Sequence, residues 1–172
     1  VNQMVNYDFI KKQIKDDEKL KIAPYTLAYK EKTGKHVVEK TKTGGYGHKF
    51  LKGEKEPKEG YTKQYWEDVF EKDFEIALNG ARNIIPEDTI DPIAFGILVE
   101  MVYQMGESRV KGFTKAMGFL KKKEYSLAAD QLLYNYNDDG SQKGLTKWHN
   151  QTDGRANRAS DRLLALFQPM SH

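Results

Sequence analysis

One apolar stretch strongly limits the folds that this chain can adopt. Residues 93–105 (IAFGILVEMVYQM) would be apolar on nearly every side of a helix, so other elements must cover such a helix from all directions. Asp91 and Pro92 before the stretch supply a capping carboxylate and a proline suited to the first helical position, and Gly106 follows as a stop signal. The sequence therefore predicts a buried central helix that ends at Gly106.

The N-terminal part has a different composition. Residues 7–20 place apolar side chains at helical spacing and predict one short helix. Residues 22–50 are rich in Tyr, Thr, Val and Gly, and Pro24 excludes a helix interior. This segment predicts strands and turns, with a hairpin tip at Thr33–Gly34. Residues 52–60 (KGEKEPKEG) predict a polar loop.

The remainder predicts helices. Thr62 is a candidate N-cap for a long helix, whose apolar face comprises Trp66, Val69, Phe70, Phe74, Ala77, Leu78 and Ala81. Shorter helices are predicted at about 114–123, 126–136 and 155–167, with a polar segment at 137–144. The order predicts a single α+β domain over residues 1–172. It consists of a small N-terminal β lobe of about residues 21–60 and a larger all-helical lobe of about residues 1–20 and 61–172.

Composition excludes several classes of site. The absence of cysteine excludes disulfides, thiolate zinc sites and cysteine nucleophiles. The four histidines lack metal-ligand spacing, so no metal is predicted. With 28 basic and 25 acidic residues the net charge is +3, and the short basic runs are flanked by acids, which disfavours nucleic-acid binding. No stretch has the roughly 18 apolar residues that a membrane span needs.

Two features could carry chemistry but are weak by themselves. Residues 43–48 (TGGYGH) hold three glycines, which allow either a tight turn or a close approach of backbone to a ligand. Their spacing does not match a nucleotide-binding loop. Glu18 stands at the end of the first predicted helix, just before the β lobe, but it is one of 25 acids.

Longer motifs carry a resemblance to a known family. Residues 99–114 (VEMVYQMGESRVKGFT) resemble the central-helix signature of the T-even bacteriophage lysozymes. Residues 148–158 (WHNQTDGRANR) resemble the C-terminal segment of that family, and residues 43–48 are similar to its T-x-G-x-G-H motif. The resemblance spans roughly residues 7–167. It implies a lysozyme-like fold with a substrate cleft between the two lobes.

The resemblance also implies an activity and its residues. The expected reaction is hydrolysis of the β-1,4 bond between N-acetylmuramic acid and N-acetylglucosamine in peptidoglycan. By position, Glu18 corresponds to the general acid and Thr43 to the threonine that holds the attacking water. Gln104 corresponds to a residue lining the cleft, and Arg155 to the arginine that orients the acid.

The same resemblance implies a structural pair, His48 with Asp73, and no cofactor. The expected partners are peptidoglycan glycan strands, with no nucleic acid and no membrane insertion, and the expected state is a monomer. Residues 1–12 do not form the apolar region of a secretory signal. We therefore expect synthesis in a bacterial host cytoplasm, with action on the wall after release or as part of a phage particle.

The family's second catalytic carboxylate has no clear counterpart. Glu18 and Thr43 are 25 residues apart, more than in the T-even enzymes, so the hairpin between them is enlarged. Residues 29–34 (YKEKTG) imitate a family motif and nominate Glu31. A tip at Thr33–Gly34 would place Thr43 opposite Pro24, with Glu31 about 23 Å and Glu39 about 13 Å along the ladder from Thr43. An inverting pair needs roughly 6.5–9.5 Å between carboxyls.

Two other alignments give no acid either. In the wider phage endolysins the position of the aspartate is counted from the residues that correspond to Pro24–Tyr25, and here this position falls on Leu27. Pesticin-like lysozymes carry an aspartate just after the glycine motif, and the matching residue here is Lys49. Lys19 also replaces the glycine that usually follows the catalytic glutamate. Two hypotheses therefore stay open: an active muramidase, and a non-catalytic peptidoglycan-binding or inhibitory module on a lysozyme scaffold.

Overall fold

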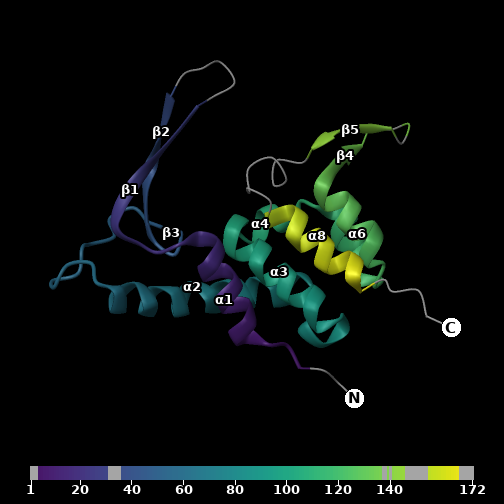
Figure 1. The fold of residues 1–172 in the computed structure, drawn as a ribbon, viewed down its shortest axis with the longest axis horizontal. Helices are drawn as coiled ribbons and strands as arrows, with labels where there is room; N and C mark the ends of the chain where they lie inside the picture. Colours follow the sequence, from purple (N-terminus) through teal and green to yellow (C-terminus); the bar gives the residue numbers. More distant parts are fainter. Residues whose placement is uncertain (1–3, 31–35, 137–138, 140, 146–154, 167–172) are drawn as a thin grey trace. The chain divides into compact units, whose positions relative to one another are not determined.

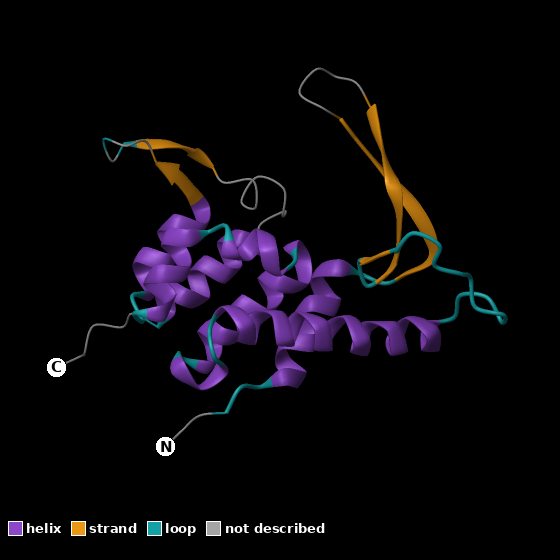
Figure 2. Cartoon of the chain, turned by 180° about the vertical axis from the view of Figure 1, so that it is seen from behind, coloured by secondary structure: helices purple, strands orange, loops and turns teal. Residues whose placement is uncertain are grey.

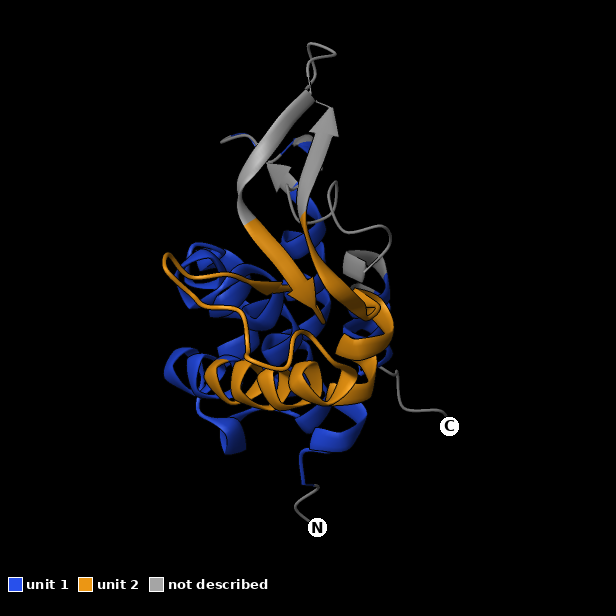
Figure 3. Cartoon of the chain, turned by 90° about the vertical axis from the view of Figure 1, so that its left-hand side faces the viewer, with its two compact units in different colours: residues 1–10, 77–172 blue, residues 11–76 orange. Residues whose placement is uncertain are grey.

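The computed structural model describes residues 4–30, 36–136, 139, 141–145 and 155–166 (Figure 1). The chain divides into two compact units, one of residues 11–76 and one of residues 1–10 and 77–172 (Figure 3). The division falls within helices α1 (Tyr7–Glu18) and α2 (Lys63–Ile84). The unit of residues 11–76 therefore contains the predicted β lobe together with parts of both flanking helices.

Helix α1 matches the predicted N-terminal helix and has a cap at each end. Asn6 Oδ1 accepts a hydrogen bond of 3.0 Å from the backbone N–H of Phe9, as an N-cap residue does. At the other end Lys19 has a φ of 56°, and its N–H donates to the carbonyl of Lys15 at 3.0 Å. This is the left-handed helix stop usually made by glycine, so lysine stands here in a backbone conformation that suits glycine better.

A three-stranded antiparallel sheet follows, as predicted for this segment. Its strands are β1 (Lys21–Lys30), β2 (His36–Gly45) and β3 (His48–Lys49), in the order β1-β2-β3. Strands β1 and β2 form a long hairpin, and β3 pairs only with the end of β2 that carries the glycines (Figure 2). The predicted tip, Thr33–Gly34, lies outside the described residues.

The register of the hairpin corrects one prediction. Thr43 pairs with Tyr25 rather than with Pro24. The ladder is irregular farther along, where residues 39–41 of β2 lie opposite Leu27 alone. Three residues opposite one form a bulge that shifts the pairing by two residues. On the tip side of the bulge Lys30 pairs with His36 rather than with Val37, one residue short of an even count from Thr33–Gly34, so at Thr43 the pairing is one residue past that count.

Helix α2 begins where the sequence predicts. Thr62 Oγ1 accepts a hydrogen bond of 3.1 Å from the N–H of Tyr65, which confirms the N-cap. Within residues 11–76, the helix buries Trp66, Phe70 and Phe74, which are 0%, 1% and 2% exposed. This confirms the predicted apolar face and gives the small sheet an aromatic base.

Helix α3 (Pro92–Met105) is the buried central helix. The side chain of Asp91 accepts a hydrogen bond of 2.8 Å from the N–H of Ile93, and the helix stops at Gly106, which has a φ of 86°. Every residue from 94 to 102 is buried. The helix predicted from the apolar stretch is confirmed, including both of its ends.

The other helices of the unit of residues 1–10 and 77–172 pack around α3 or on each other. They are η1 (Glu87–Thr89), α4 (Glu107–Lys111), α5 (Thr114–Lys121), α6 (Tyr125–Leu133) and α8 (Arg155–Ala165). Helix α3 contacts η1, α4 and α8, while α6 packs against α5 and α8. Within the described ranges, no helix is both long and apolar enough to span a membrane.

A second, two-stranded sheet adds to the helical lobe and was not predicted. Strand β4 (Tyr134–Tyr136) pairs with β5 (Gln142–Leu145). The helix predicted over 126–136 was therefore too long, because α6 ends at Leu133 and Tyr134 is already extended. The sequence YNYNDDG alternates tyrosine with asparagine before turn residues, which is a hairpin signal.

Candidate active site

The carboxylate of Glu18 lies against the glycine motif. Glu18 is the last residue of α1 and is half-buried. A Cβ atom built on Gly47 would lie 2.8 Å from Cδ of Glu18, closer than two such carbons can approach. Gly47 also has a φ of 75°, which favours glycine. The turn between β2 and β3 therefore fits the Glu18 carboxylate only because residue 47 has no side chain.

The other two glycines of the motif make room for Trp66. A Cβ atom on Gly44 would lie 2.7 Å from Cζ2 of the indole ring, and one on Gly45 would lie 2.6 Å from its Cδ2. The Trp66 Nε1–H donates to the carbonyl of Ile22 on β1 at 2.8 Å. Trp66 thus packs under β2 and hydrogen-bonds β1, which fixes the glycine motif on α2. Apolar spacing predicts Trp66 in the core, but no local sequence pattern indicates this contact, which joins segments about twenty residues apart.

The hydroxyl of Thr43 is a buried polar group. Thr43 is only 4% exposed, and its Oγ1 has no hydrogen-bond partner among the described residues. A buried hydroxyl left without a partner costs about 1–3 kcal/mol, so such groups usually serve a purpose. As far as the described residues are concerned, the Thr43 hydroxyl is therefore available to hold a water molecule or a substrate hydroxyl.

A polar network holds Tyr46, the central residue of the motif. The Tyr46 hydroxyl donates to Glu67 Oε1 at 2.6 Å, and Lys15 Nζ contacts the other oxygen of Glu67 at 2.6 Å. Burial, with the hydrogen bond to Glu67, raises the pKa of Tyr46 to about 12. The hydrogen bond from Lys15 is the largest cause of a lowered pKa at Glu67. The network links α1, α2 and the motif turn, and no motif in the sequence indicated that Lys15, Tyr46 and Glu67 belong together.

His48 lies between two carboxylates. Its Nδ1 is 2.6 Å from Asp73 Oδ2, and its Nε2 is 3.1 Å from both carboxylate oxygens of Glu54. Both partners are acceptors, so only the protonated imidazole can donate to both. The hydrogen bond to Asp73 raises the pKa of His48 above its usual value, against the opposing effect of burial, and Glu54 raises it further. The predicted partner Asp73 is in place, whereas Glu54 belongs to a segment that the sequence analysis described only as a polar loop.

The residues beside Thr43 in the sheet include no acid. Thr43 pairs with Tyr25 on one side and with Lys49 on the other, and cross-strand partners share a face of the sheet. Glu39 belongs to β2, and Glu31 lies outside the described residues. Within the described part of the chain, no group of three or more His, Cys, Asp or Glu residues could hold a metal ion.

The two remaining candidates belong to the other unit. Gln104 lies in the last turn of α3 and is partly exposed, and Arg155 is the first residue of α8. Glu18, Thr43, His48 and Asp73 all belong to the unit of residues 11–76.

Comparison with known proteins identifies the family. The sequence profile of the phage lysozyme family matches residues 26–152. A protein of Dictyostelium discoideum named probable T4-type lysozyme 2 is 31% identical over 137 residues, which cover 72% of this chain and 73% of that relative. The chain belongs to the phage lysozyme family. This family consists of lysozyme-like glycoside hydrolases that act on peptidoglycan, and the chain has the α+β fold that the sequence predicts.

The family match does not cover every candidate residue. Thr43 and Gln104 fall within residues 26–152, whereas Glu18 precedes this range and Arg155 follows it. For Glu18 the structure adds an independent observation, since its carboxylate meets Gly47 inside the matched region. A glycosidase needs a carboxylic acid next to the sugar-binding surface, and the carboxylate of Glu18 packs against the backbone of the glycine motif at Gly47.

Proposed function

We propose that this chain cleaves the β-1,4 bond between N-acetylmuramic acid and N-acetylglucosamine and thereby lyses bacterial cells. The observation that carries the proposal is the contact of the Glu18 carboxylate with Gly47. It brings an acid from α1 to the same turn that follows Thr43, whose hydroxyl is buried and has no partner among the described residues.

In this mechanism Glu18 is the general acid. It protonates the glycosidic oxygen as the bond to the anomeric carbon breaks, and this proton transfer accelerates the reaction by about 10²–10⁴-fold. Thr43 positions the water that attacks the anomeric carbon. A second group must take a proton from that water, and the candidates Glu31 and Glu39 both belong to the enlarged hairpin. Gln104 binds the sugar chain, and Arg155 orients Glu18.

One observation favours a second candidate, a non-catalytic peptidoglycan-binding or inhibitory module. Lys49 lies directly across from Thr43, at the position where pesticin-like lysozymes carry an aspartate. A lysine cannot act as the base that activates water while it is protonated.

Digestion of purified peptidoglycan distinguishes the two candidates. A muramidase releases soluble fragments whose new reducing end is N-acetylmuramic acid, which borohydride reduction and mass spectrometry identify. Fragments that end in a reducing N-acetylglucosamine would instead show cleavage of the other glycosidic bond of the glycan strand, between N-acetylglucosamine and the next N-acetylmuramic acid, and would overturn the proposed bond specificity. Sedimentation of the protein with intact peptidoglycan, without release of any fragment, would establish the binding module instead.

We further propose that the chain acts in bacteriolysis by a phage, after release from the host cytoplasm or from a phage particle. Two measurements test where the chain acts. One is lysis of bacteria to which the purified chain is added from outside, and the other is lysis of bacteria that express the chain inside the cell.

A further inference from the structure

A pocket of about 570 Å³ lies on the face of the sheet opposite to Thr43. Lys42 lines this pocket, and because successive residues of a strand point to opposite faces, Thr43 points away from it. Phe50 also lines the pocket, and its N–H donates to the carbonyl of Lys42 at 2.9 Å. The volume is within the range of small-ligand sites. The pocket is thus distinct from the candidate catalytic residues of the same unit.

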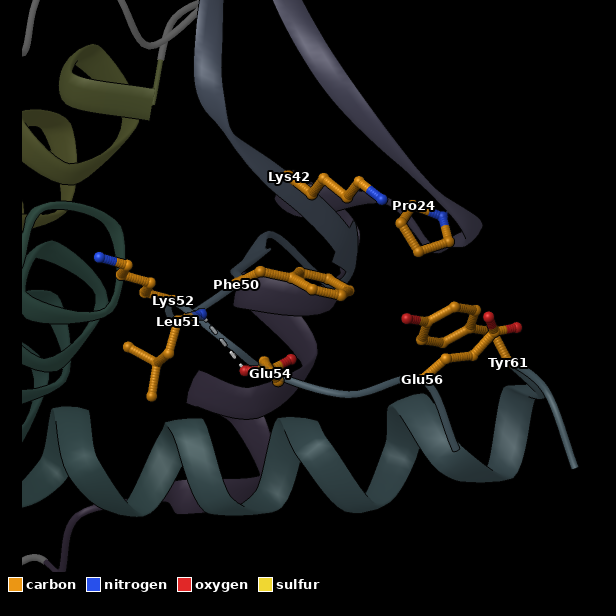
Figure 4. A pocket seen from close by; sticks show the side chains of 8 residues that line it. All are labelled: Pro24, Lys42, Phe50, Leu51, Lys52, Glu54, Glu56 and Tyr61. Carbon is orange, nitrogen blue, oxygen red and sulfur yellow. Dashed lines mark hydrogen bonds between the residues drawn. The ribbon is translucent and has the colours of Figure 1, made fainter. Parts of the chain in front are cut away.

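Aromatic rings form a rigid apolar floor for the pocket. The rings of Phe50 and Tyr61 are 6.1 Å apart, and they lie 6.0 Å and 5.3 Å from the ring of Trp66. Trp66 is fully buried, so it fixes both rings from below. Figure 4 shows the ring of Pro24 on the other side, above Tyr61. A ligand can therefore bury an apolar segment between these rings.

Charges of opposite sign flank this floor. Lys42 extends along one wall, and Glu54 and Glu56 come from the segment on the other side (Figure 4). The same segment also contributes Lys52, which lies beside Leu51 and away from Glu56. Glu54 is held by His48, 3.1 Å from its Nε2. Glu56 is exposed at the rim of the pocket, near Tyr61. Burial is the main cause of the raised pKa of Tyr61, and the negative charge of Glu56 raises this pKa further. The pocket therefore offers a cation, an apolar surface and an anion in sequence.

We propose that this pocket binds the peptide part of peptidoglycan through a diamino-acid side chain that bears both an ammonium and a carboxylate group. The inference rests on the proposed function, because it takes peptidoglycan as the ligand. Lys42 pairs with the carboxylate, the methylene chain lies over Phe50 and Tyr61, and Glu56 pairs with the ammonium, which also gains from the aromatic faces. Charge complementarity favours the peptide over the sugar chain, since the N-acetylated sugars offer no ammonium to Glu56.

Titration of the ¹⁵N-labelled full chain by NMR tests the proposal with two sugar-free tripeptides. One ends in meso-diaminopimelate and the other in lysine, which lacks the side-chain carboxylate. We expect the first peptide to shift the amides of residues 50–56 and 61, and to bind about tenfold more tightly than the second, as loss of one charged hydrogen bond predicts. Equal affinities, or shifts away from the pocket, would overturn the proposal. So would shifts of these amides by a tetramer of N-acetylglucosamine, which would make the pocket a sugar site.

Matched variants locate the two charges. In Lys42→Gln the two peptides should bind equally, and Glu56→Gln should weaken both. Lys55→Gln and Glu59→Gln are the matched controls, because they remove the same charges at exposed residues near Glu56 that do not line the pocket. These two variants should leave the affinities for both peptides unchanged. These measurements are independent of hydrolysis: peptide binding without cleavage of peptidoglycan would keep this inference and remove the proposed muramidase, and cleavage without peptide binding would do the reverse.

Discussion

The carboxylate of Glu18 lies against Gly47, in the space that a side chain there would need: a Cβ atom at residue 47 would lie 2.8 Å from Cδ of Glu18. This relationship ties the end of α1 to the turn between β2 and β3. It gives the third glycine of the TGGYGH motif a physical role, which is to let a carboxylate pack against backbone. Variants of the two residues should therefore affect activity in related ways.

Replacement of Glu18 by Gln should abolish hydrolysis while the fold is kept. The amide has nearly the same shape but no transferable proton, so the rate should fall by about 10²–10⁴-fold. Turnover on purified peptidoglycan and the melting temperature are the measurements. Asp16→Asn, an exposed site two residues earlier in α1, removes the same charge and should stay active. Wild-type turnover by Glu18→Gln would exclude Glu18 from the mechanism.

Replacement of Gly47 by Ala should reduce activity more than stability. The new methyl group displaces the Glu18 carboxylate, and a misplacement of about 1 Å can cost roughly 100-fold in rate. Gly53→Ala is the matched control, because Gly53 also has a positive φ, of 81°, but a Cβ atom added there would meet no atom within 4 Å. Each variant should lose about 1–2 kcal/mol from backbone strain, while only Gly47→Ala should lose activity. Equal loss of activity in both would assign the effect to strain alone.

Replacement of Lys19 by Gly should stabilise the chain. Lys19 has a φ of 56°, so relief of its strain should contribute about 1 kcal/mol, or about 2–4 °C in melting temperature for a chain of this length. Lys12→Gly is the contrast, because it places glycine in an exposed helical position of α1 and should cost about 1 kcal/mol. A lower melting temperature for Lys19→Gly would show that the lysine side chain contributes more than its backbone costs.

Local signals in the sequence were sufficient for the start of helix α2 and both ends of helix α3, but not for the short elements η1 and α4, which were not predicted. Asp91 and Gly106 mark the ends of α3, and Thr62 marks the start of α2, because a cap depends on residues within one turn of the helix. The same reasoning should have limited α6, since the tyrosines and turn residues after Leu133 indicate a hairpin. These elements could be predicted because their determinants are neighbours in sequence.

The site depended on contacts that local patterns do not encode. The glycine motif is shaped by Trp66 and Glu18, each about twenty or more residues away in sequence, and nothing in the spacing of the glycines names either partner. The family resemblance nominated Glu18, but only the folded chain shows its contact with Gly47. The shift at Thr43 combines a one-residue difference on the tip side, where Lys30 pairs with His36, with the two-residue irregularity opposite Leu27, and such bulges have no simple sequence signal.

Replacement of Asp73 by Asn should destabilise the chain in a pH-dependent way. The folded-state pKa of His48 is raised, chiefly by the hydrogen bond to Asp73. Because the pKa is raised on folding, protonation of His48 stabilises the fold fully when the pH is below the unfolded-state pKa of about 6.5. This contribution is lost as the pH rises through the folded-state pKa. The difference in unfolding free energy between wild type and Asp73→Asn should thus be largest near pH 6, at about 1.5–3 kcal/mol, and should shrink at higher pH.

Thermal melts between pH 5.5 and 9 measure this difference. Asp68→Asn is the control, because it makes the same change at an exposed position of α2 and should show little pH-dependent effect. A difference that stays constant with pH, or grows as pH rises, would mean that protonated His48 is not what Asp73 stabilises.

The long hairpin of β1 and β2 should serve lysis of whole cells rather than stability. Residues 28–42 carry seven charged side chains in fifteen positions, and a two-stranded ribbon of this kind adds little stability in water. Ala28 pairs with Val38, so residues 29–37 can be replaced by Asn-Gly, a pair suited to a two-residue turn between cross-strand partners. We expect an unchanged melting temperature and reduced lysis of intact bacteria. Replacing residues 30–37 instead would join Tyr29 to Val38, which are not partners, and should lower the melting temperature. Unchanged lysis by the in-register deletion would show that the extension is dispensable and would remove Glu31 as a candidate for the second carboxylate.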